Sequence, residues 1–308
     1  MTNTGFSAQH TLYDAVHGTL PWAALHPGTD GPLPVCLFLF GGGGSVDSLE
    51  AIAPLLREGW STRRLHPMIV ACLGVDPFCF YLDAPRHGMH WESAVSHSLL
   101  DAVQARFPTS GRNGLVGISM GGYGALKIAF RKPDIFAAVA AMAPMLEPSC
   151  DAQTAPLRNR FHYPPDVPAA LLGSERDAEL FAADHPVTRA RHNAKGIREH
   201  NLAIWMDAGS RDSCHAHDGT EWLHRVLWQL DIAHGYTLLR DADHVGPSLI
   251  PRLERAFAFV GGHLSAPSPP PSPEEQALRA TLSGARATAL SQDASVARTY
   301  GALPPEEW

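Results

Sequence analysis

The chain reads Gly117-Ile118-Ser119-Met120-Gly121-Gly122 between a strand-like run over residues 113–118 and a helix-forming run over residues 125–130. A serine with glycine two positions before it and two positions after it, in this strand–turn–helix context, predicts a nucleophile elbow. Glycine is needed because the turn is too tight for neighbouring side chains. We expect Ser119 to stand above the sheet edge, with the backbone N–H of Met120 facing an oxyanion formed there.

The rest of the chain alternates buried-strand patterns with helical patterns. Near-continuous apolar runs are typical of parallel strands covered on both faces. The alternation predicts an α/β fold in three layers, a mostly parallel central sheet with helices on both faces. The expected strands are 35–40, 67–73, 114–118, 136–142, 202–206 and the shorter 236–239, and the expected helices are 48–58, 92–107, 123–131, 217–230 and 248–260.

A serine nucleophile needs an orienting acid, which follows it on a loop after a later strand. The expected strand 202–206 is followed by two aspartates that qualify by position, Asp207 and Asp212. Asp212 is favoured because it lies beyond a glycine turn, where its carboxylate can reach an imidazole. Asp207, still at the strand end and better placed to brace the loop, and Asp218 remain open as alternatives.

The general base is expected after the last strand and before the final helix. His244 occupies that position. Because the chain has 17 histidines, a histidine alone carries little weight, and topology alone singles out His244.

An oxyanion hole needs a second backbone donor, from the loop after an early strand. Residues Gly41 to Gly44 sit there, and four glycines let the main chain approach a tetrahedral intermediate closely. A phosphate-binding loop is the competing interpretation, but the Lys-Ser/Thr ending of a P-loop is missing. A flexible turn without a further role is the other alternative.

A metal site is the alternative function for the stretch Cys214-His215-Ala216-His217-Asp218. Histidines two positions apart would point away from each other on a helix, and no second ligand pair at a familiar spacing accompanies them. We therefore expect no metal and interpret the stretch as the start of a helix.

The domain expected to carry these residues spans 1–264, and residues 265–308 form a tail. The segment 147–185 breaks the α/β alternation and is expected to pass over the active site. The tail begins with a proline-rich linker over 265–273, followed by helix-forming composition over 274–290. It either frays or docks onto the body or onto a second subunit of a homo-oligomer, which would cover Leu278, Leu282, Tyr300, Leu303 and Trp308.

Composition excludes several classes of protein. The chain has 308 residues, 45% of them apolar, and a net charge of −7, which permits one large core and disfavours nucleic acid as a partner. Residues 1–20 lack the pattern of a signal peptide, and no apolar run approaches the ~20 residues of a membrane span. Five scattered cysteines, Cys36, Cys72, Cys79, Cys150 and Cys214, indicate reduced thiols in a cytoplasmic protein.

Three groups of residues resemble one known family. They are the glycine-rich segment that starts at Phe40, the stretch Phe78-Cys79-Phe80-Tyr81-Leu82-Asp83-Ala84-Pro85 followed by Trp91-Glu92, and the elbow with Ala125. They resemble the branch of the α/β-hydrolases that contains esterase D (S-formylglutathione hydrolase), feruloyl and acetyl xylan esterases, and mycolyltransferases. The resemblance covers roughly residues 10–262.

This resemblance implies an α/β-hydrolase fold, with Ser119 as nucleophile, Asp212 as acid and His244 as base. It also implies oxyanion donors at the backbone of Gly42 and Met120, and no cofactor. Two departures bear on the substrate. The family usually has histidine where this chain has Phe40, and an acidic-aromatic pair where it has Val245-Gly246.

The expected function is a serine esterase that cleaves a small-molecule carboxylic ester, with a preference for short acyl chains. An acyltransferase with the same triad, passing the acyl group to an alcohol or sugar, is the alternative, and a non-catalytic partner-binding protein is a more remote one. Phe40, Gly43, Tyr81 and Trp91 are candidates for the substrate pocket, although core packing explains Trp91 equally well.

Overall fold

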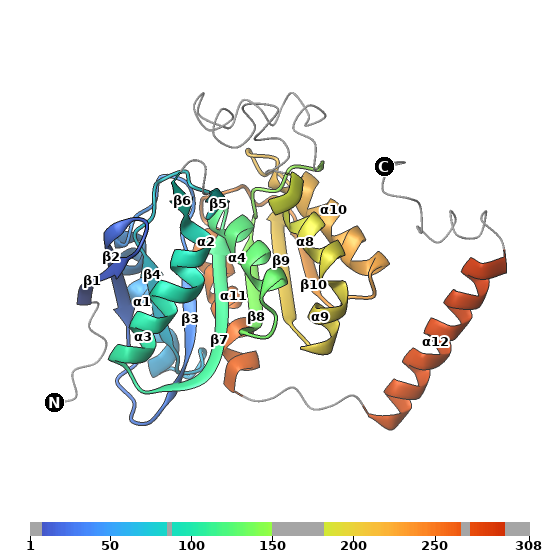
Figure 1. The fold of residues 1–308 in the computed structure, drawn as a ribbon, viewed down its shortest axis with the longest axis horizontal. Coiled ribbons are helices and arrows are strands. Elements are labelled where there is room, and N and C mark those ends of the chain that lie inside the picture. Colours follow the sequence, from blue (N-terminus) through green and yellow to red (C-terminus); the bar gives the residue numbers. More distant parts are fainter. Residues whose placement is uncertain (1–7, 85–87, 150–181, 266–271, 293–308) are drawn as a thin grey trace. The chain divides into compact units, whose positions relative to one another are not determined.

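Figure 1 shows the computed structural model of the chain, which describes residues 8–84, 88–149, 182–265 and 272–292. The chain divides into two compact units, Met1–Ala266 and Pro267–Trp308. Most of the expected excursion (150–181), most of the expected linker (266–271) and the last residues of the tail (293–308) lie outside the described residues. The first unit holds every described strand.

An eight-stranded sheet forms the centre of this unit, in the order β1-β2-β4-β3-β7-β8-β9-β10. Every neighbouring pair from β4 to β10 is parallel, whereas β2 pairs antiparallel with both β1 and β4. The predicted mostly parallel sheet is therefore confirmed. Its strands are β1 (Ala8–Asp14), β2 (Gly18–Leu25), β3 (Leu33–Leu39), β4 (Ile69–Leu73), β7 (Thr109–Ile118), β8 (Phe136–Met142), β9 (Ala203–Gly209) and β10 (Gly235–Leu239).

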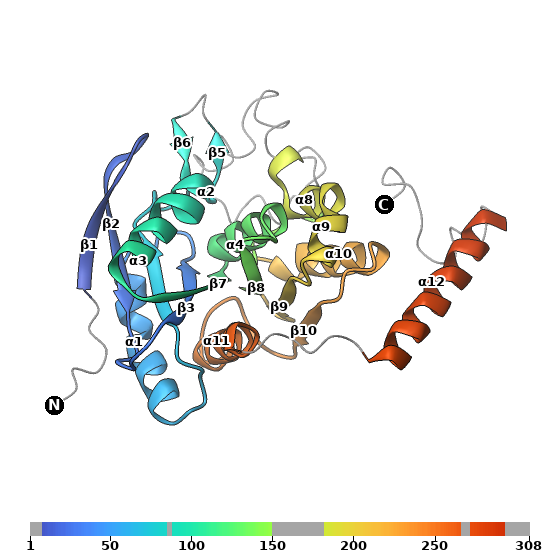
Figure 2. The same cartoon turned by 60° about the horizontal axis from the view of Figure 1, so that its bottom comes forward.

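Helices cover both faces of the sheet, as the alternation predicts (Figure 2). On one face, α1 (Asp47–Ser61) packs against α11 (Leu249–Ser265), and α11 lies across β3, β7 and β8. The other face carries α4 (Met120–Arg131), α8 (Pro186–His192) and α10 (Ala216–Gln229), with α9 (Ala194–Glu199) next to α8. β3 and β4 are buried along their whole length, as their apolar sequences require.

The helix expected over 92–107 forms in three parts. These are α2 (Trp91–Ser93), a π-helical turn η2 (Ala94–Leu99) and α3 (Leu100–Arg106). A small antiparallel pair, β5 (Asp83–Ala84) and β6 (Met89–His90), precedes it.

The sequence interpretation missed the antiparallel strands β1 and β2. β1 lacks a continuous apolar run because it lies at the sheet edge, and Pro21 interrupts β2. Asp14 closes the turn between the two strands by accepting hydrogen bonds from the amides of Val16 and His17. α8 and α9 were also missed.

The second unit contains α12 (Pro273–Gln292), which covers the part of the tail with helix-forming composition. Leu278 and Leu282 are exposed on it. Among the described residues, no helix combines the length and the apolar character that crossing a bilayer requires.

Candidate active site

Ser119 lies in a strained turn between β7 and α4, with φ 57° and ψ −122°. Non-glycine residues rarely adopt positive φ, and such strain is frequent at functional sites. Two close approaches hold the turn. A Cβ on Gly117 would lie 2.1 Å from the carbonyl oxygen of Gly121, and a Cβ on Gly121 would lie 1.9 Å from that of Leu39. The glycines that predicted the elbow are therefore sterically required.

Ser119, His244 and Asp212 form one hydrogen-bonded chain. Nε2 of His244 lies 2.9 Å from Oγ of Ser119, and Nδ1 lies 2.9 Å from Oδ2 of Asp212. A carboxylate only accepts hydrogen bonds, so the proton is on Nδ1 and Nε2 accepts from the serine hydroxyl. His244 and Asp212 are buried. The three residues come from three loops, after β7, β9 and β10.

The carboxylate of Asp212 is held by its own loop. It accepts hydrogen bonds from the backbone amides of Cys214, at 2.9 Å, and Ala216, at 3.3 Å. A second aspartate joins this loop to the histidine loop, because Oδ1 of Asp243 accepts from the amides of both Ser213 and His244. These backbone hydrogen bonds lower the pKa of the Asp243 carboxyl. Asp243 therefore ties the loop of Asp212 to the loop of His244.

The two alternative acids make other contacts. Asp207 is buried against Arg252, which donates to both of its carboxylate oxygens. Asp218 lies 3.3 Å from Nε2 of His217, on α10. Only Asp212, of the three candidates, contacts the imidazole of His244 in the described structure.

The loop Gly41 to Gly44 lies beside the serine. A Cβ on Gly41 would be 3.2 Å from Cβ of Ser119. The amides of Gly43 and Gly44 donate to the carbonyls of Pro77 and Gly41. Within the described residues, the amides of Gly42 and Met120 donate no hydrogen bond, which leaves them available to a ligand.

The aromatic side chains expected in the substrate pocket are buried. Phe40, Tyr81 and Trp91 are each at most 4% exposed, and Trp91 stacks on His17. They therefore offer a substrate little surface. Tyr81 acts from behind the loop, because its hydroxyl donates to the carbonyl of Phe40 at 3.2 Å. The backbone of Tyr81 also has a positive φ of 54°.

Two exposed apolar side chains lie on the loops around the site. Phe78, 43% exposed, packs against Gly42, whose Cβ would be 2.8 Å from the ring. Val245, 57% exposed, directly follows His244. Both positions belong to the stretches that carry or depart from the family resemblance, but the sequence does not predict that they lie at the site. Because residues 42 and 78 are far apart in the sequence, sequence patterns do not predict the contact of Phe78 with the loop.

A buried ionic cluster lies behind the elbow. Lys127 of α4 is fully buried and pairs with Glu92, at 3.1 Å, and with Asp184. Arg131 and Arg189 add a second cation to each carboxylate. Although burial opposes it, the attraction of Lys127 and Arg189 lowers the pKa of Asp184. The cluster links Asp184, which lies just before α8, to α4.

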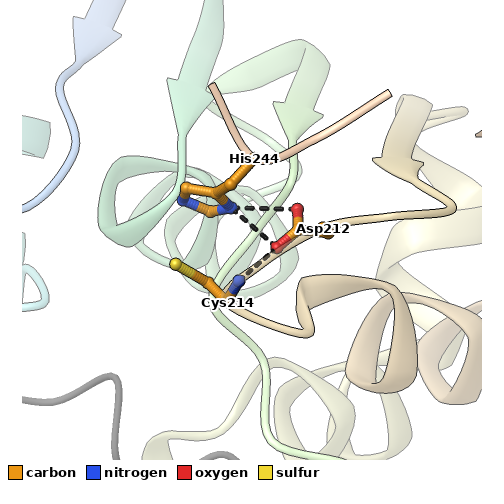
Figure 3. Close-up of side chains that lie close together, drawn as sticks. All are labelled: Asp212, Cys214 and His244. Atoms are coloured by element: carbon orange, nitrogen blue, oxygen red, sulfur yellow. Dashed lines mark hydrogen bonds and ion pairs between the residues drawn. The ribbon is translucent and has the colours of Figure 1, made fainter. Parts of the chain in front are cut away.

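Cys214 lies against the acid and the base (Figure 3). It is partly exposed, and burial together with the nearby carboxylates of Asp212 and Asp243 raises the pKa of its thiol. The thiol is therefore a weak nucleophile beside Ser119. Cys214 precedes His215 and His217 in the sequence, whereas in the structure the neighbours that could hold a metal ion with it are Asp212 and His244.

Comparisons with known proteins identify the family of the chain. The sequence model of a family described as "Putative esterase" matches residues 78–246, more than half of the chain, and this range contains Ser119, Asp212 and His244.

Solved structures share the fold. A ferulic acid esterase has a TM-score of 0.69 at 17% identity over 84% of this chain and 98% of its own. An S-formylglutathione hydrolase from Agrobacterium tumefaciens has a TM-score of 0.65 at 19% identity over 85% and 98%. The fluorophosphonate-binding serine hydrolase FphF of Staphylococcus aureus has a TM-score of 0.66 at 17% identity over 84% and 99%. The fold is therefore that of the α/β-hydrolases.

Proposed function

Since this chain belongs to the "Putative esterase" family and is a carboxylic ester hydrolase, we propose that it cleaves its substrate by two-step acyl transfer through Ser119. The observation that carries the proposal is the hydrogen-bonded chain from Ser119 through His244 to Asp212, with 2.9 Å at each link. This is the order of contacts that a serine nucleophile, its general base and an orienting acid require.

In the first step, Nε2 of His244 takes the proton of Ser119 as Oγ attacks the ester carbonyl. Asp212 holds the Nδ1–H tautomer and stabilises the imidazolium that forms. The imidazolium then protonates the leaving alcohol, and the acyl group remains on Ser119. In the second step, His244 activates a water molecule, which releases the acid and restores the serine.

The amides of Gly42 and Met120 are proposed to bind the oxyanion. Both lie on the chain segments that flank Ser119, and their hydrogen atoms are not used within the described structure. One such donor is worth about 3 kcal/mol of transition-state stabilisation. The buried position of Met120 keeps its amide fixed between the serine and α4.

We propose a short acyl chain for the substrate. The ring of Phe78 lies directly against Gly42 and so limits the space beside the oxyanion loop. Phe78 and Val245 give the site an apolar rim. Such a rim suits the hydrocarbon part of an ester better than a charged acyl group.

A fluorophosphonate probe and a p-nitrophenyl ester series test the proposal. We expect labelling of the wild type, no labelling of Ser119→Ala, and rates that fall from acetate to long acyl esters. An unlabelled wild type that is folded by circular dichroism would refute the serine mechanism. A maximum at long chains would refute the acyl preference, and acyl transfer to an added alcohol in place of free acid would favour the transferase alternative.

A further inference from the structure

A thiol, a carboxylate and an imidazole lie close together in the proposed active site (Figure 3). One ligand atom from each of Asp212, Cys214 and His244 lies within 4.8 Å of the other two. Asp212 and His244 are buried, and Cys214 is partly exposed, which gives a dissolved ion access. The backbone fixes the group, because the amide of Cys214 donates to Oδ1 of Asp212.

This donor set suits a thiophilic divalent cation. Thiolate, imidazole and carboxylate are the ligands of zinc, with bonds of about 2.0–2.3 Å and tetrahedral geometry. Such bonds bring neighbouring ligand atoms to about 3.3–3.8 Å from one another. The three ligand atoms lie within 4.8 Å of one another, so they need to approach by about 1 Å or somewhat more to reach this spacing.

We propose that Zn²⁺ or Cd²⁺ binds to Asp212, Cys214 and His244 and that the bound ion inhibits the enzyme. The thiol gives its proton to solvent as the bond to sulfur forms. The remaining coordination position is filled by water. The ion is an inhibitor and takes no part in ester cleavage.

Inhibition follows whichever nitrogen of His244 binds the ion. An ion on Nε2 uses the lone pair that accepts the proton of Ser119. An ion on Nδ1 breaks the hydrogen bond to Asp212 and moves the imidazole proton to Nε2, which then cannot act as a base. This part of the inference rests on the proposed function, whereas binding of the ion does not.

Cadmium alone is the probe for binding, because a cadmium–thiolate bond gives an ultraviolet charge-transfer band. We expect the band when one equivalent of Cd²⁺ is added to the wild-type protein. In Cys214→Ser the band should be lost, and the affinity for Cd²⁺ should be at least about 10-fold weaker. Cys72→Ser, at a buried thiol outside this group, is the control and should keep the band. A band that survives in Cys214→Ser, or is lost in Cys72→Ser, would overturn the site.

Activity and binding are separated with Ser119→Ala. This variant keeps all three ligands, so it should bind Cd²⁺ with wild-type affinity. In the wild type, Zn²⁺ should inhibit ester cleavage, and a chelator should restore it. In Cys214→Ser, Zn²⁺ should cause much less inhibition relative to the metal-free rate of that variant.

Equal inhibition of the wild type and Cys214→Ser would disprove the inhibitory site. An inactive wild type that still shows the cadmium band would instead refute only the proposed function, because binding needs no turnover.

Discussion

Arg252 holds Asp207 through two parallel hydrogen bonds in the core, Nε to Oδ2 at 3.0 Å and Nη2 to Oδ1 at 2.7 Å. Nη1 of the same guanidinium donates to the carbonyl of Asp243, the residue before His244. Asp207 is therefore connected through Arg252 to the loop that carries His244. Asp212 contacts the imidazole itself. Two aspartates five positions apart thus have separable effects.

Replacing each aspartate by asparagine should separate activity from stability. Asp212→Asn favours the wrong tautomer of His244, so we expect kcat to fall by about 10⁴ with little change in melting temperature. Asp207→Asn leaves the buried Arg252 without its charge partner, and we expect the free energy of unfolding to fall by about 3–5 kcal/mol. Ester kinetics and thermal unfolding of both variants measure these two effects. A loss of stability in Asp212→Asn together with a loss of kcat alone in Asp207→Asn would contradict the roles given to the two residues.

Tyr81→Phe should weaken catalysis without touching the reacting groups. The variant loses the hydrogen bond from the Tyr81 hydroxyl to the carbonyl of Phe40, the residue before the loop proposed to bind the oxyanion. We expect kcat to fall about tenfold with KM nearly unchanged, because a displaced donor weakens binding of the transition state above all. Tyr13→Phe, at a side chain 79% exposed, is the control and should match the wild type. An unchanged kcat in Tyr81→Phe would show that the loop holds its position without this bond.

Lys127→Met tests the buried ionic cluster. The substitution leaves Glu92 and Asp184 in the core with one cation fewer, and we expect a loss of about 3–5 kcal/mol in unfolding free energy. The matched control is Lys195→Met, which breaks an exposed pair with Glu199 at 3.7 Å and should change stability by less than about 1 kcal/mol. Urea unfolding at neutral pH measures the unfolding free energy of both variants. Equal losses would show that the buried cluster does not stabilise the fold more than an exposed pair does.

His185 gives the stability of the protein a specific pH dependence. Burial lowers the pKa of His185 to about 4 from 6.5. Its Nδ1 accepts from the amide of Val187, and its Nε2 lies 3.1 Å from the carbonyl of Glu147. The ring is thus satisfied in its neutral form, with the proton on Nε2.

A histidine with a depressed pKa contributes its stability above the unfolded-state pKa and loses it as pH falls toward the folded-state pKa. We expect the His185 contribution to be intact above pH 6.5 and to fall by about 3 kcal/mol by pH 4. In His185→Asn, the decline between these pH values should be correspondingly shallower. His66→Asn, at an exposed imidazole, should decline as the wild type does. Parallel curves for wild type and His185→Asn would contradict the prediction.

The elbow and the parallel sheet could be predicted because their causes are local. Gly117 and Gly121 are fixed by the tight turn itself, and the buried strands β3 and β4 carry their apolar runs in the sequence. The preference for Asp212 over Asp207 as the residue facing His244 came from the glycine turn between them. In each case the physical requirement acts on neighbouring residues.

The surroundings of the site could not be predicted in this way. Phe78 reaches Gly42, and Cys214 reaches His244, only through the packing of loops far apart in the chain. Conversely, the apolar character of Tyr81 and Trp91 is the same whether a side chain faces the core or a substrate. Periodicity does not distinguish the two cases, and the structure finds both side chains buried.

Helix α4 is buried from Met120 to Phe130. Its residues should therefore tolerate substitution less well than exposed residues near the site do. A larger side chain on this helix would overpack the buried neighbours of the segment that begins directly after Ser119. Phe78 and Val245 are exposed to solvent on two separate loops, and neither residue belongs to this helix. A search for altered substrate range should therefore randomise these rim positions and leave the helix intact, since selectivity can drift there while the reaction is conserved.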